Sequence, residues 1–392
     1  MLKKSSVDTV SCKDASVEHQ ANYFHTPCNN TSGFRVVRVY FRFPPELGGM
    51  ETHIAQLSVA QRELGVEVLN LYSIGEEAPL AIRLFSKYSL SHIRPAVLRN
   101  AIFYANALSA RNKVRGTKPT ILHVHGDWSD FLFSKPLAIA IGANVVVASI
   151  HDSISRSKRM LYRPSLSHCD LVFVTGKNDQ IILQKLLNRE IYHCPSAPLD
   201  LFFEIPKRNK NFSCDVIIVA NFFRKKRLDI VLECAKRRPQ LRFAILGHGP
   251  EYEEIVKLTA ERNINNLVFL GRCKPVQVAE ALQAAKVFLL TSEQEGTPTA
   301  ALEAMAAGLP VILTPSNRYD WLVKPGENGF ITSSWEINEI VARIDEVLSD
   351  ESYREIMGQS GRRFVMDNHT WRANAMRINS LMAKCLELRI GG

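Results

Sequence analysis

Long apolar stretches are missing from this chain of 392 residues. No run of 18 or more apolar residues occurs, so we expect no membrane-spanning helix. The first residues hold two lysines with no apolar segment behind them, which argues against a cleaved secretory signal. Residues 1–33 are polar with little periodicity and are expected to form a flexible leader. With 46% hydrophobic and 22% charged residues, the rest is typical of a soluble globular protein long enough for two domains.

Closely spaced cysteines are also missing. The eight cysteines are scattered along the chain, and no Cys-x-x-Cys pair occurs. The nearest neighbours in sequence, Cys12 with Cys28 and Cys194 with Cys214, lack the spacing of a zinc site. We therefore expect buried free thiols in a reducing compartment, and a cytoplasmic protein.

Acidic residues are missing from one whole segment. Residues 78–126 contain no Asp or Glu. The chain as a whole carries a formal charge of +10, and this segment contributes much of it. The cations of this segment are Arg83, Lys87, Arg94, Arg99, Arg111, Lys113, Arg115 and Lys118. Apolar residues are interleaved with them. The segment is therefore either a solvated basic helix face with core contacts, or a surface for the inner face of an anionic membrane or for an anionic, lipid-linked acceptor. Nucleic acid ranks last, because no nucleic-acid-binding motif accompanies the charge.

Short apolar runs alternate with helix-like segments, which predicts parallel α/β units. We expect strands at 34–40, 66–72, 121–124, 145–149 and 171–174, and again at 215–219, 243–246, 267–270, 287–290 and 311–313. Prolines and charges between them mark a linker. The pattern predicts two Rossmann-like α/β domains facing across a cleft, with ligands at the carboxyl ends of the strands. Their bounds are 34–197 and 198–370, and a C-terminal helix, 371–392, is expected to pack back on the N-terminal domain.

One run near the C-terminal end combines a strand, a turn and a helix start. The strand 287–290 is followed by a Gly-Thr-Pro turn, and then by an Ala-rich helix that ends at Gly308. Glu295 lies in the loop before this helix, and Glu303 lies one turn beyond Thr299, from where it can reach back toward the helix N-terminus. The N-terminus suits a phosphate, and a carboxylate suits a pair of sugar hydroxyls. The run therefore offers places for both halves of a sugar nucleotide.

The same run resembles the signature of glycosyltransferase family 4, Ser-x-x-Glu-Gly-x-Pro followed by Glu-Ala-Met-Ala-x-Gly-x-Pro-Val. The resemblance implies the GT-B fold and a retaining, hexosyltransferase-type reaction with a nucleoside-diphosphate sugar as the donor. It also implies that Glu303 holds the ribose diol of the donor, and that Glu295 and the backbone of the following turn hold the sugar. The residues of that turn are Gly296, Thr297, Pro298 and Thr299.

A second motif follows the first expected strand. Phe43-Pro-Pro-Glu-Leu-Gly-Gly-Met-Glu resembles the family's Pro-Pro…Gly-Gly-(Ile/Met)-Glu loop. Gly48 and Gly49 permit a tight turn and a close approach of the backbone to a ligand, and the helix that starts near Met50 can cradle a diphosphate with its N-terminus. A plain strand–turn–helix junction is the alternative.

Two histidines end neighbouring strands. His125 follows the strand at 121–124, and His151 follows the strand at 145–149. The resemblance implies that His151 faces the transferred sugar, and we place His125 beside it on the acceptor side. Each is otherwise a structural histidine.

The second half resembles the family's donor-binding loops. Lys226 matches the lysine that neutralises the donor diphosphate, but Asn221 stands where the family has arginine, and Arg224 is the nearest substitute. Gly247, in Gly-His-Gly-Pro, matches a turn near the nucleotide, and Arg272 lies where the family holds the base.

No Asp-x-Asp occurs, which removes the usual divalent-metal site of the other major glycosyltransferase fold. We therefore expect a metal-independent enzyme without a cofactor, in which Lys226, nearby arginine and helix N-termini offset the diphosphate. The predicted activity is transfer of a sugar from a nucleotide sugar to a glycan or lipid-linked acceptor, in cell-surface polysaccharide or glycolipid synthesis. Two alternatives are a sugar-nucleotide 2-epimerase on a similar scaffold and a non-catalytic sugar-nucleotide-binding subunit.

Overall fold

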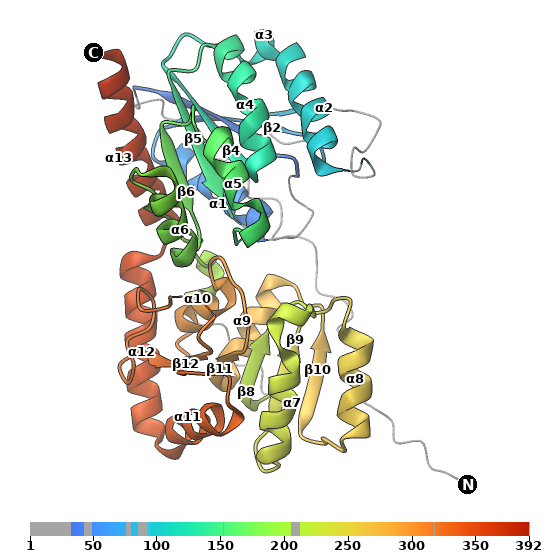
Figure 1. The fold of residues 1–392 in the computed structure, drawn as a ribbon. Coiled ribbons are helices and arrows are strands. Elements are labelled where there is room, and N and C mark those ends of the chain that lie inside the picture. Colours follow the sequence, from blue (N-terminus) through green and yellow to red (C-terminus); the bar gives the residue numbers. More distant parts are fainter. Residues whose placement is uncertain are drawn as a thin grey trace. The chain divides into compact units, whose positions relative to one another are not determined.

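The computed structural model describes residues 33–42, 49–75, 80–84, 93, 95–151, 153–204, 212–316 and 318–391. These residues belong to two compact units. The first unit runs to Ala197 and takes in the chain again from His369, and the second unit is Pro198–Asn368. In each unit a twisted sheet is flanked by helices (Figure 1). The leader predicted for residues 1–33 lies, apart from Gly33, outside the described residues.

The first unit is built on a sheet of seven parallel strands among the described residues. The spatial order is β3-β2-β1-β4-β5-β6-β7, so the direction in which strands are added reverses between β1 and β4. In sheets of this kind the crevice beyond that reversal is the usual ligand site. The strands are β1 (Arg35–Val39), β2 (Glu67–Tyr72), β3 (Ala81–Arg83), β4 (Thr120–Gly126), β5 (Val145–Ile150), β6 (Leu171–Val174) and β7 (Tyr192–His193).

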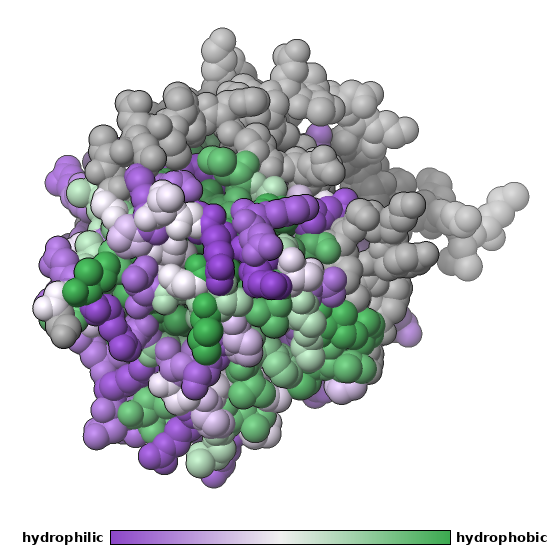
Figure 2. Space-filling view, turned by 90° about the horizontal axis from the view of Figure 1, so that it is seen from above, coloured by the Kyte–Doolittle hydropathy of each residue, from purple (hydrophilic) through white to green (hydrophobic). Residues whose placement is uncertain are grey.

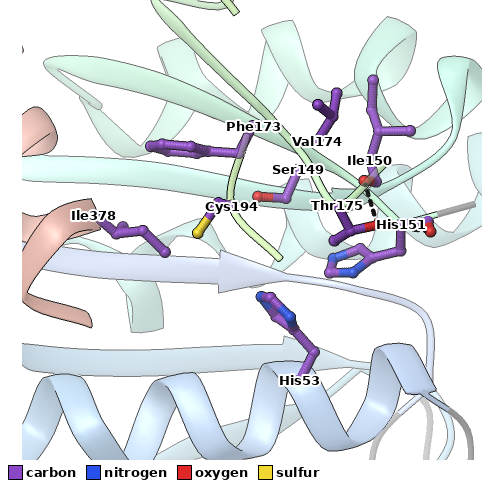
Figure 3. A pocket seen from close by; sticks show the side chains of 9 residues that line it. All are labelled: His53, Ser149, Ile150, His151, Phe173, Val174, Thr175, Cys194 and Ile378. Atoms are coloured by element: carbon purple, nitrogen blue, oxygen red, sulfur yellow. Dashed lines mark hydrogen bonds between the residues drawn. The ribbon is translucent and has the colours of Figure 1, made fainter. Parts of the chain in front are cut away.

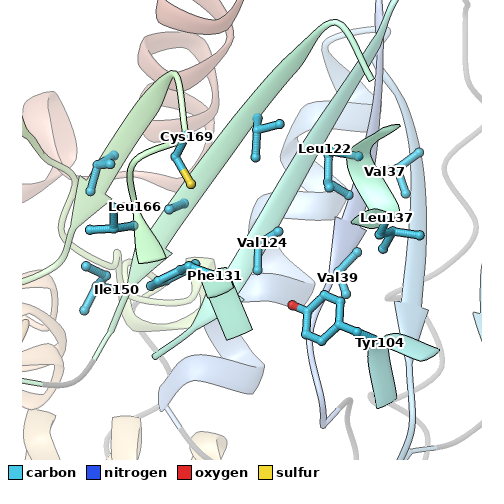
Figure 4. Packing of buried hydrophobic residues seen from close by; sticks show 14 of the residues in the cluster. Val37, Val39, Tyr104, Leu122, Val124, Phe131, Leu137, Ile150, Leu166 and Cys169 are labelled. Carbon is cyan, nitrogen blue, oxygen red and sulfur yellow. The ribbon is translucent and has the colours of Figure 1, made fainter. Parts of the chain in front are cut away.

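Helices cover both faces of this sheet. They are α1 (Gly49–Glu63), α2 (Ala96–Ser109), α3 (Arg111–Val114), α4 (Trp128–Ile141), α5 (Arg159–Ser165), α6 (Lys177–Leu187) and α13 (Trp371–Ile390). Successive strand residues point to opposite faces. Val37 and Val39 accordingly join the cluster that contains Phe131 of α4 and Tyr104 of α2 (Figure 4), whereas Val36 joins the cluster with α1 and α13. The C-terminal helix α13 thus packs on the first sheet, against α1 and β5.

The second unit repeats the same plan. Among the described residues, six parallel strands have the order β10-β9-β8-β11-β12-β13, and the reversal lies between β8 and β11. The strands are β8 (Cys214–Val219), β9 (Phe243–Leu246), β10 (Leu267–Gly271), β11 (Ala285–Leu290), β12 (Val311–Leu313) and β13 (Gly329–Ile331). The helices are α7 (Leu228–Arg237), α8 (Tyr252–Glu261), α9 (Pro275–Gln283), α10 (Thr299–Ala306), α11 (Ile337–Ser349) and α12 (Glu351–Asn368).

The ten predicted strands occur, each within two residues of its expected bounds. Three further strands, β3, β7 and β13, were not predicted. Each has two or three residues and lies at the edge of its sheet. Within the parts of the chain that the structure describes, no helix is long and apolar enough to cross a membrane. Four of the thiols, Cys169, Cys194, Cys214 and Cys234, are buried and free.

Candidate functional site

The strand reversal of the second unit brings two loops together. The loop after β8 carries Lys226, and the loop after β11 carries Glu295. The two strands are neighbours in the sheet although 69 residues separate the two side chains. Parallel strands end at the same edge, so the topology alone brings these loops side by side at the place where such sheets bind ligands.

Lys226 and Glu295 form an ion pair, in which Nζ of the lysine donates to Oε1 of the glutamate. The hydroxyl of Ser292 donates to the same carboxylate oxygen at 2.7 Å. The side chains are only 16% and 12% exposed, so solvent screens the pair less than it screens a surface pair. The backbone is tied as well, because Oγ1 of Thr291 donates to the carbonyl of Lys226 at 2.8 Å. The sequence placed Lys226 on a diphosphate and Glu295 on a sugar, and in the structure the two groups hold each other.

Glu303 lies in the second turn of α10 and is half-buried. Burial raises the pKa of its carboxyl to about 8. No side chain or backbone group among the described residues hydrogen-bonds this carboxyl, so its hydrogen-bonding capacity is available to a ligand. This is the chemistry that a pair of neighbouring hydroxyls requires.

The helix α10 begins at Thr299, after Pro298, and Gly308 follows it with φ +84°. Proline before the first turn and glycine after the last turn are the ordinary boundary residues of a helix. The N–H of Thr299 already donates to the carbonyl of Thr297 at 2.9 Å. Gly296 and Thr297 lie in the loop that joins Glu295 to the helix.

The remaining residues predicted for the donor lie at the same edge of the second sheet. Asn221 and Arg224 follow β8 and are exposed, and Arg272 follows β10 and is exposed. Gly247 follows β9 with φ +133°, and a Cβ there would lie 1.9 Å from the carbonyl oxygen of Ala220. Glycine therefore allows the loops after β8 and β9 to pack together.

In the first unit, Gly48 lies outside the described residues, and Gly49 is the first residue of α1. His125 is the last residue but one of β4, and His151 follows β5 directly. Nδ1 of His125 and Nε2 of His151 are hydrogen-bonded at 2.8 Å, so the two predicted histidines do meet.

The structure adds His53 of α1 to this pair. Its ring lies edge-on to that of His151, with the centroids 4.6 Å apart, and its Nδ1 is 2.9 Å from Oγ of Ser196. Figure 3 shows the rings of His53 and His151 pointing toward one another across a small pocket. The motifs in the sequence did not point to His53, which lies two residues beyond the Gly-Gly-Met-Glu motif; its position four residues after Gly49 was the available signal.

These histidines are neutral. Burial is the main cause that lowers the pKa of each, and the positive charge of buried Arg38 on β1 lowers it further. The pKa of His151 falls to about 3. Thr175 fixes the backbone of His151, because Oγ1 donates to its carbonyl at 2.9 Å. A neutral imidazole held in this way offers one donor and one acceptor.

No group of three or more His, Cys, Asp or Glu side chains that could hold a metal ion occurs in the described ranges of the chain. The arrangement of the second unit instead offers a fixed cation, two carboxyl groups and a helix start at one sheet edge. The first unit offers neutral imidazoles at the carboxyl ends of β4 and β5.

Comparison with known proteins covers both units. The family model described as "Glycosyltransferase Family 4" matches residues 47–195, and the model described as "Glycosyl transferases group 1" matches residues 203–364. A sulfoquinovosyl transferase of Arabidopsis thaliana is 27% identical over 42% of this chain. The match spans only 32% of that relative's length. A GDP-mannose-dependent phosphatidylinositol monomannoside mannosyltransferase of Mycolicibacterium smegmatis is 26% identical over 44% of this chain and 49% of its own length.

Among solved structures, the HepE protein of Anabaena in complex with UDP and glucose superimposes with a TM-score of 0.70. The match covers 89% of this chain and 99% of that one, at 14% sequence identity. At this identity the likeness shows the fold, which is the GT-B fold of two Rossmann-like domains.

Proposed function

The chain belongs to glycosyltransferase family 4, among the group 1 glycosyl transferases, and on that basis we propose that it moves a sugar from a nucleoside-diphosphate sugar to a glycan or lipid-linked acceptor. It is a glycosyltransferase. We also propose that transfer retains the anomeric configuration of the donor. The relatives described above are named as sugar transferases, which does not favour the epimerase or the non-catalytic subunit.

One observation carries the donor assignment. Lys226 and Glu295 are paired at the strand reversal of the second sheet, beside a helix start and the carboxyl of Glu303, which no described residue hydrogen-bonds. A diphosphate needs positive charge nearby. The hydroxyl groups of a sugar and of a ribose need groups that accept their hydrogen bonds. The bound UDP of the Anabaena protein supports a nucleotide donor for a chain of the same fold.

In the proposed complex, Glu303 accepts from the ribose diol, and Glu295 with the backbone of 296–299 binds the sugar. Lys226, Arg224 and the start of α10 offset the diphosphate, without a metal ion or a cofactor. Gly247 and Arg272 lie at the same edge, and we place the nucleotide base there. Transfer should therefore continue at full rate in the presence of EDTA, and loss of turnover that Mg²⁺ restores would reject this part of the proposal.

The acceptor is assigned to the first unit, where His151 faces the transferred sugar. The acceptor hydroxyl oxygen attacks the anomeric carbon, the bond from that carbon to the diphosphate oxygen breaks, and the leaving phosphate takes the acceptor proton. Attack on the face that the phosphate leaves retains the configuration and needs no enzyme nucleophile. This step is the one that the family resemblance implies.

A panel of nucleotide sugars tests the donor. A ligand at a hundred times its Kd stabilises a protein by about 2.7 kcal/mol, which shifts Tm measurably. We expect one nucleotide sugar to shift Tm, and NMR of the product made with an acceptor panel to show the donor's own anomeric configuration. Change of the donor in the absence of acceptor would identify an epimerase. A Tm shift with no turnover on any acceptor would identify a binding subunit.

A membrane surface is the second part of the acceptor proposal. Of the cations in the acid-free segment, Arg111, Lys113 and Arg115 are exposed, whereas most of its apolar residues pack on the core. Exposed apolar residues do occur on the same helical layer, such as Leu98 of α2 and Ile139 of α4. Figure 2 shows hydrophilic and hydrophobic residues side by side on the face that it presents. Cations beside exposed apolar groups suit an anionic lipid surface. The phosphatidylinositol-based acceptor in the name of the Mycolicibacterium relative supports a lipid-linked substrate.

Sedimentation with liposomes tests this part. The chain should pellet with anionic vesicles and stay in solution with neutral ones. Replacing Arg111, Lys113 and Arg115 by glutamate should abolish pelleting, and Lys257→Glu, which changes an exposed lysine of the second unit, should not. If the same fraction of the protein sediments with anionic and with neutral vesicles, the proposed membrane surface is wrong. The assignment to the inner face of a cytoplasmic membrane is then wrong as well.

A further inference from the structure

The core around His151 is unusually polar on the side of the first sheet that faces α1 and α13. Arg38 of β1 lies opposite His123 of β4 in register, and His125 lies two residues further along the same strand and on the same face. All three side chains are buried. The guanidinium of Arg38 donates to Ser58 and Gln61 of α1. No carboxylate among the described residues pairs with this guanidinium.

The positive charge of Arg38 has a consequence for the histidines. A second buried positive charge beside it is unfavourable, so the imidazoles remain uncharged. Two neutral imidazoles that share one hydrogen bond have a single proton between them. Either His125 donates from Nδ1 to Nε2 of His151, or His151 donates from Nε2 to Nδ1 of His125.

The far nitrogen of His125 decides between these two arrangements. Nε2 of His125 is buried and has no hydrogen-bond partner among the residues that the structure describes. If His151 were the donor, this nitrogen would carry a buried N–H without an acceptor. If His125 is the donor, the nitrogen carries only a bare lone pair. Unpaired buried N–H groups are rarer in proteins than unpaired acceptors, and a buried unsatisfied donor costs about 1–3 kcal/mol.

We propose that His125 is a positioning residue that donates from Nδ1 to Nε2 of His151, and so fixes His151 in the tautomer with its proton on Nδ1. His151 then presents an N–H donor, which is matched to a hydroxyl oxygen of the transferred sugar. The sugar contact rests on the proposed function, whereas the tautomer does not. Nδ1 of His151 forms no hydrogen bond with any residue that the structure describes.

The surroundings hold the ring for this task. The planes of His125 and His151 are 20° apart with centroids at 5.1 Å, and His53 closes the other side at 4.6 Å. Trp371, the first residue of α13, packs edge-on against His53 with centroids at 5.1 Å. Rotation of the His151 ring would break these contacts together with its hydrogen bond.

Long-range ¹H–¹⁵N correlation spectra of the full chain, labelled with ¹⁵N-histidine, report the tautomer directly. We expect Nδ1 of His151 to be protonated and Nε2 to be bare, with the signals assigned by their loss in His151→Asn. An imidazole without a partner favours the opposite tautomer, with the proton on Nε2. In His125→Leu the His151 signals should therefore change to that form. His125→Asn should keep the wild-type form, because its amide nitrogen stands two bonds from Cβ, as Nδ1 does.

His123→Leu is the matched control. His123 is equally buried and is bonded through Nε2 to Ser149 at 2.7 Å, but not to His151. The His123→Leu variant should be less stable than wild type, but the tautomer of His151 should not change in it. With the donor identified by the panel above, kcat should fall about tenfold in His125→Leu, the value of one lost hydrogen bond, and recover to within about threefold of wild type in His125→Asn.

A proton on Nε2 of His151 in the wild-type chain would overturn the inference, even if the leucine variant failed to fold. So would an unchanged tautomer in His125→Leu, or wild-type kcat in that variant. If no nucleotide sugar is turned over at all, the proposed function fails, and the spectra still decide the tautomer.

Discussion

The ammonium of Lys226 and the carboxylate of Glu295 are in contact at the carboxyl edge of the second sheet, between the two strands where the strand order reverses. Ser292 donates to the same carboxylate. The pair is shielded from solvent on most of its surface. Each group therefore compensates the other before a donor arrives, and a diphosphate that approaches Lys226 competes with an acid already in place.

This relationship predicts that Lys226→Met lowers kcat/KM for the donor at least tenfold, because the diphosphate loses its fixed counter-charge and Glu295 loses the cation that compensates it. Glu295→Gln should also lower it, and the double variant should lose less than the sum of the two effects, since the groups interact. The measurement is a double-mutant cycle on transfer. Lys225→Met removes an exposed neighbouring cation and should leave kcat/KM within about twofold. Additive losses, or an equal loss in the control, would contradict the assignment.

Glu303 predicts a pH dependence of stability. Burial raises the pKa of its carboxyl from the ordinary 4.5 to about 8 in the folded chain. Between these values the folded state binds one proton more than the unfolded state, so the free energy of unfolding falls as pH rises, by at most about 1.4 kcal/mol per pH unit. At pH values above both pKa values, the free energy of unfolding has fallen by the full amount.

Glu303→Gln removes this loss. The variant and the wild type should have similar free energies of unfolding at about pH 5. At about pH 9 the free energy of unfolding of the variant should be the larger one. Urea denaturation at both pH values measures the difference, with Glu355→Gln on the exposed face of α12 as the control. A variant that is less stable than wild type at the higher pH would show that the carboxylate has a favourable partner. Turnover at the higher pH should nevertheless fall at least tenfold, because an amide is a poorer acceptor for the ribose diol than the ionised carboxylate.

Most strands that the sequence predicted have a central place in a sheet, and the exception, the edge strand β10, was found from its continuous apolar run at 267–270 although only Leu267 is buried. Val216, Ile217 and Ile218 of β8 are buried on both faces, so their apolar run is continuous and visible. The edge strands β3 and β7 are short and half-exposed, and little in their local composition distinguishes them from loops. Pairing with a neighbouring strand makes them strands, and that pairing is not encoded locally.

The candidate site divides in the same way. Motif resemblance marked Lys226, Glu295 and Glu303, but contact between residues 69 apart follows only from the order of the strands. The buried face of α1 includes the apolar residues Ile54 and Leu57, yet it also includes Ser58 and Gln61. These polar residues are buried because they bind Arg38, which belongs to another element. A helical period in hydropathy cannot reveal such a partner.

Gly247 predicts a backbone requirement of the donor edge. Its φ of +133° opposes any larger residue, and so does the carbonyl oxygen of Ala220, which a Cβ at this position would approach to 1.9 Å. Gly271 also has a positive φ, +67°, but a Cβ there meets nothing within 4 Å. Gly247→Ala should therefore lower the free energy of unfolding by at least about 2 kcal/mol more than Gly271→Ala. Urea unfolding of both variants measures this, and equal losses would show that the loop after β9 yields without strain.

Arg224 is the cation that we expect to replace the arginine found at position 221 in the family. Asn221 cannot supply charge to the diphosphate, and the exposed Arg224, three residues later, follows the same strand. Arg224→Ala should raise KM for the donor about fivefold to tenfold with a smaller change in kcat, which is the result of losing a contact that is equally strong in the bound donor and in the transition state. Asn221→Arg, made in the Arg224→Ala background, should restore most of the lost affinity, because it returns a guanidinium to the family position. If Arg224→Ala binds donor as wild type does, Lys226 and the start of α10 suffice, and the substitution of arginine by Asn221 needs no compensating residue. Tm shifts with donor, measured on the same variants, separate this loss of binding from a loss of fold.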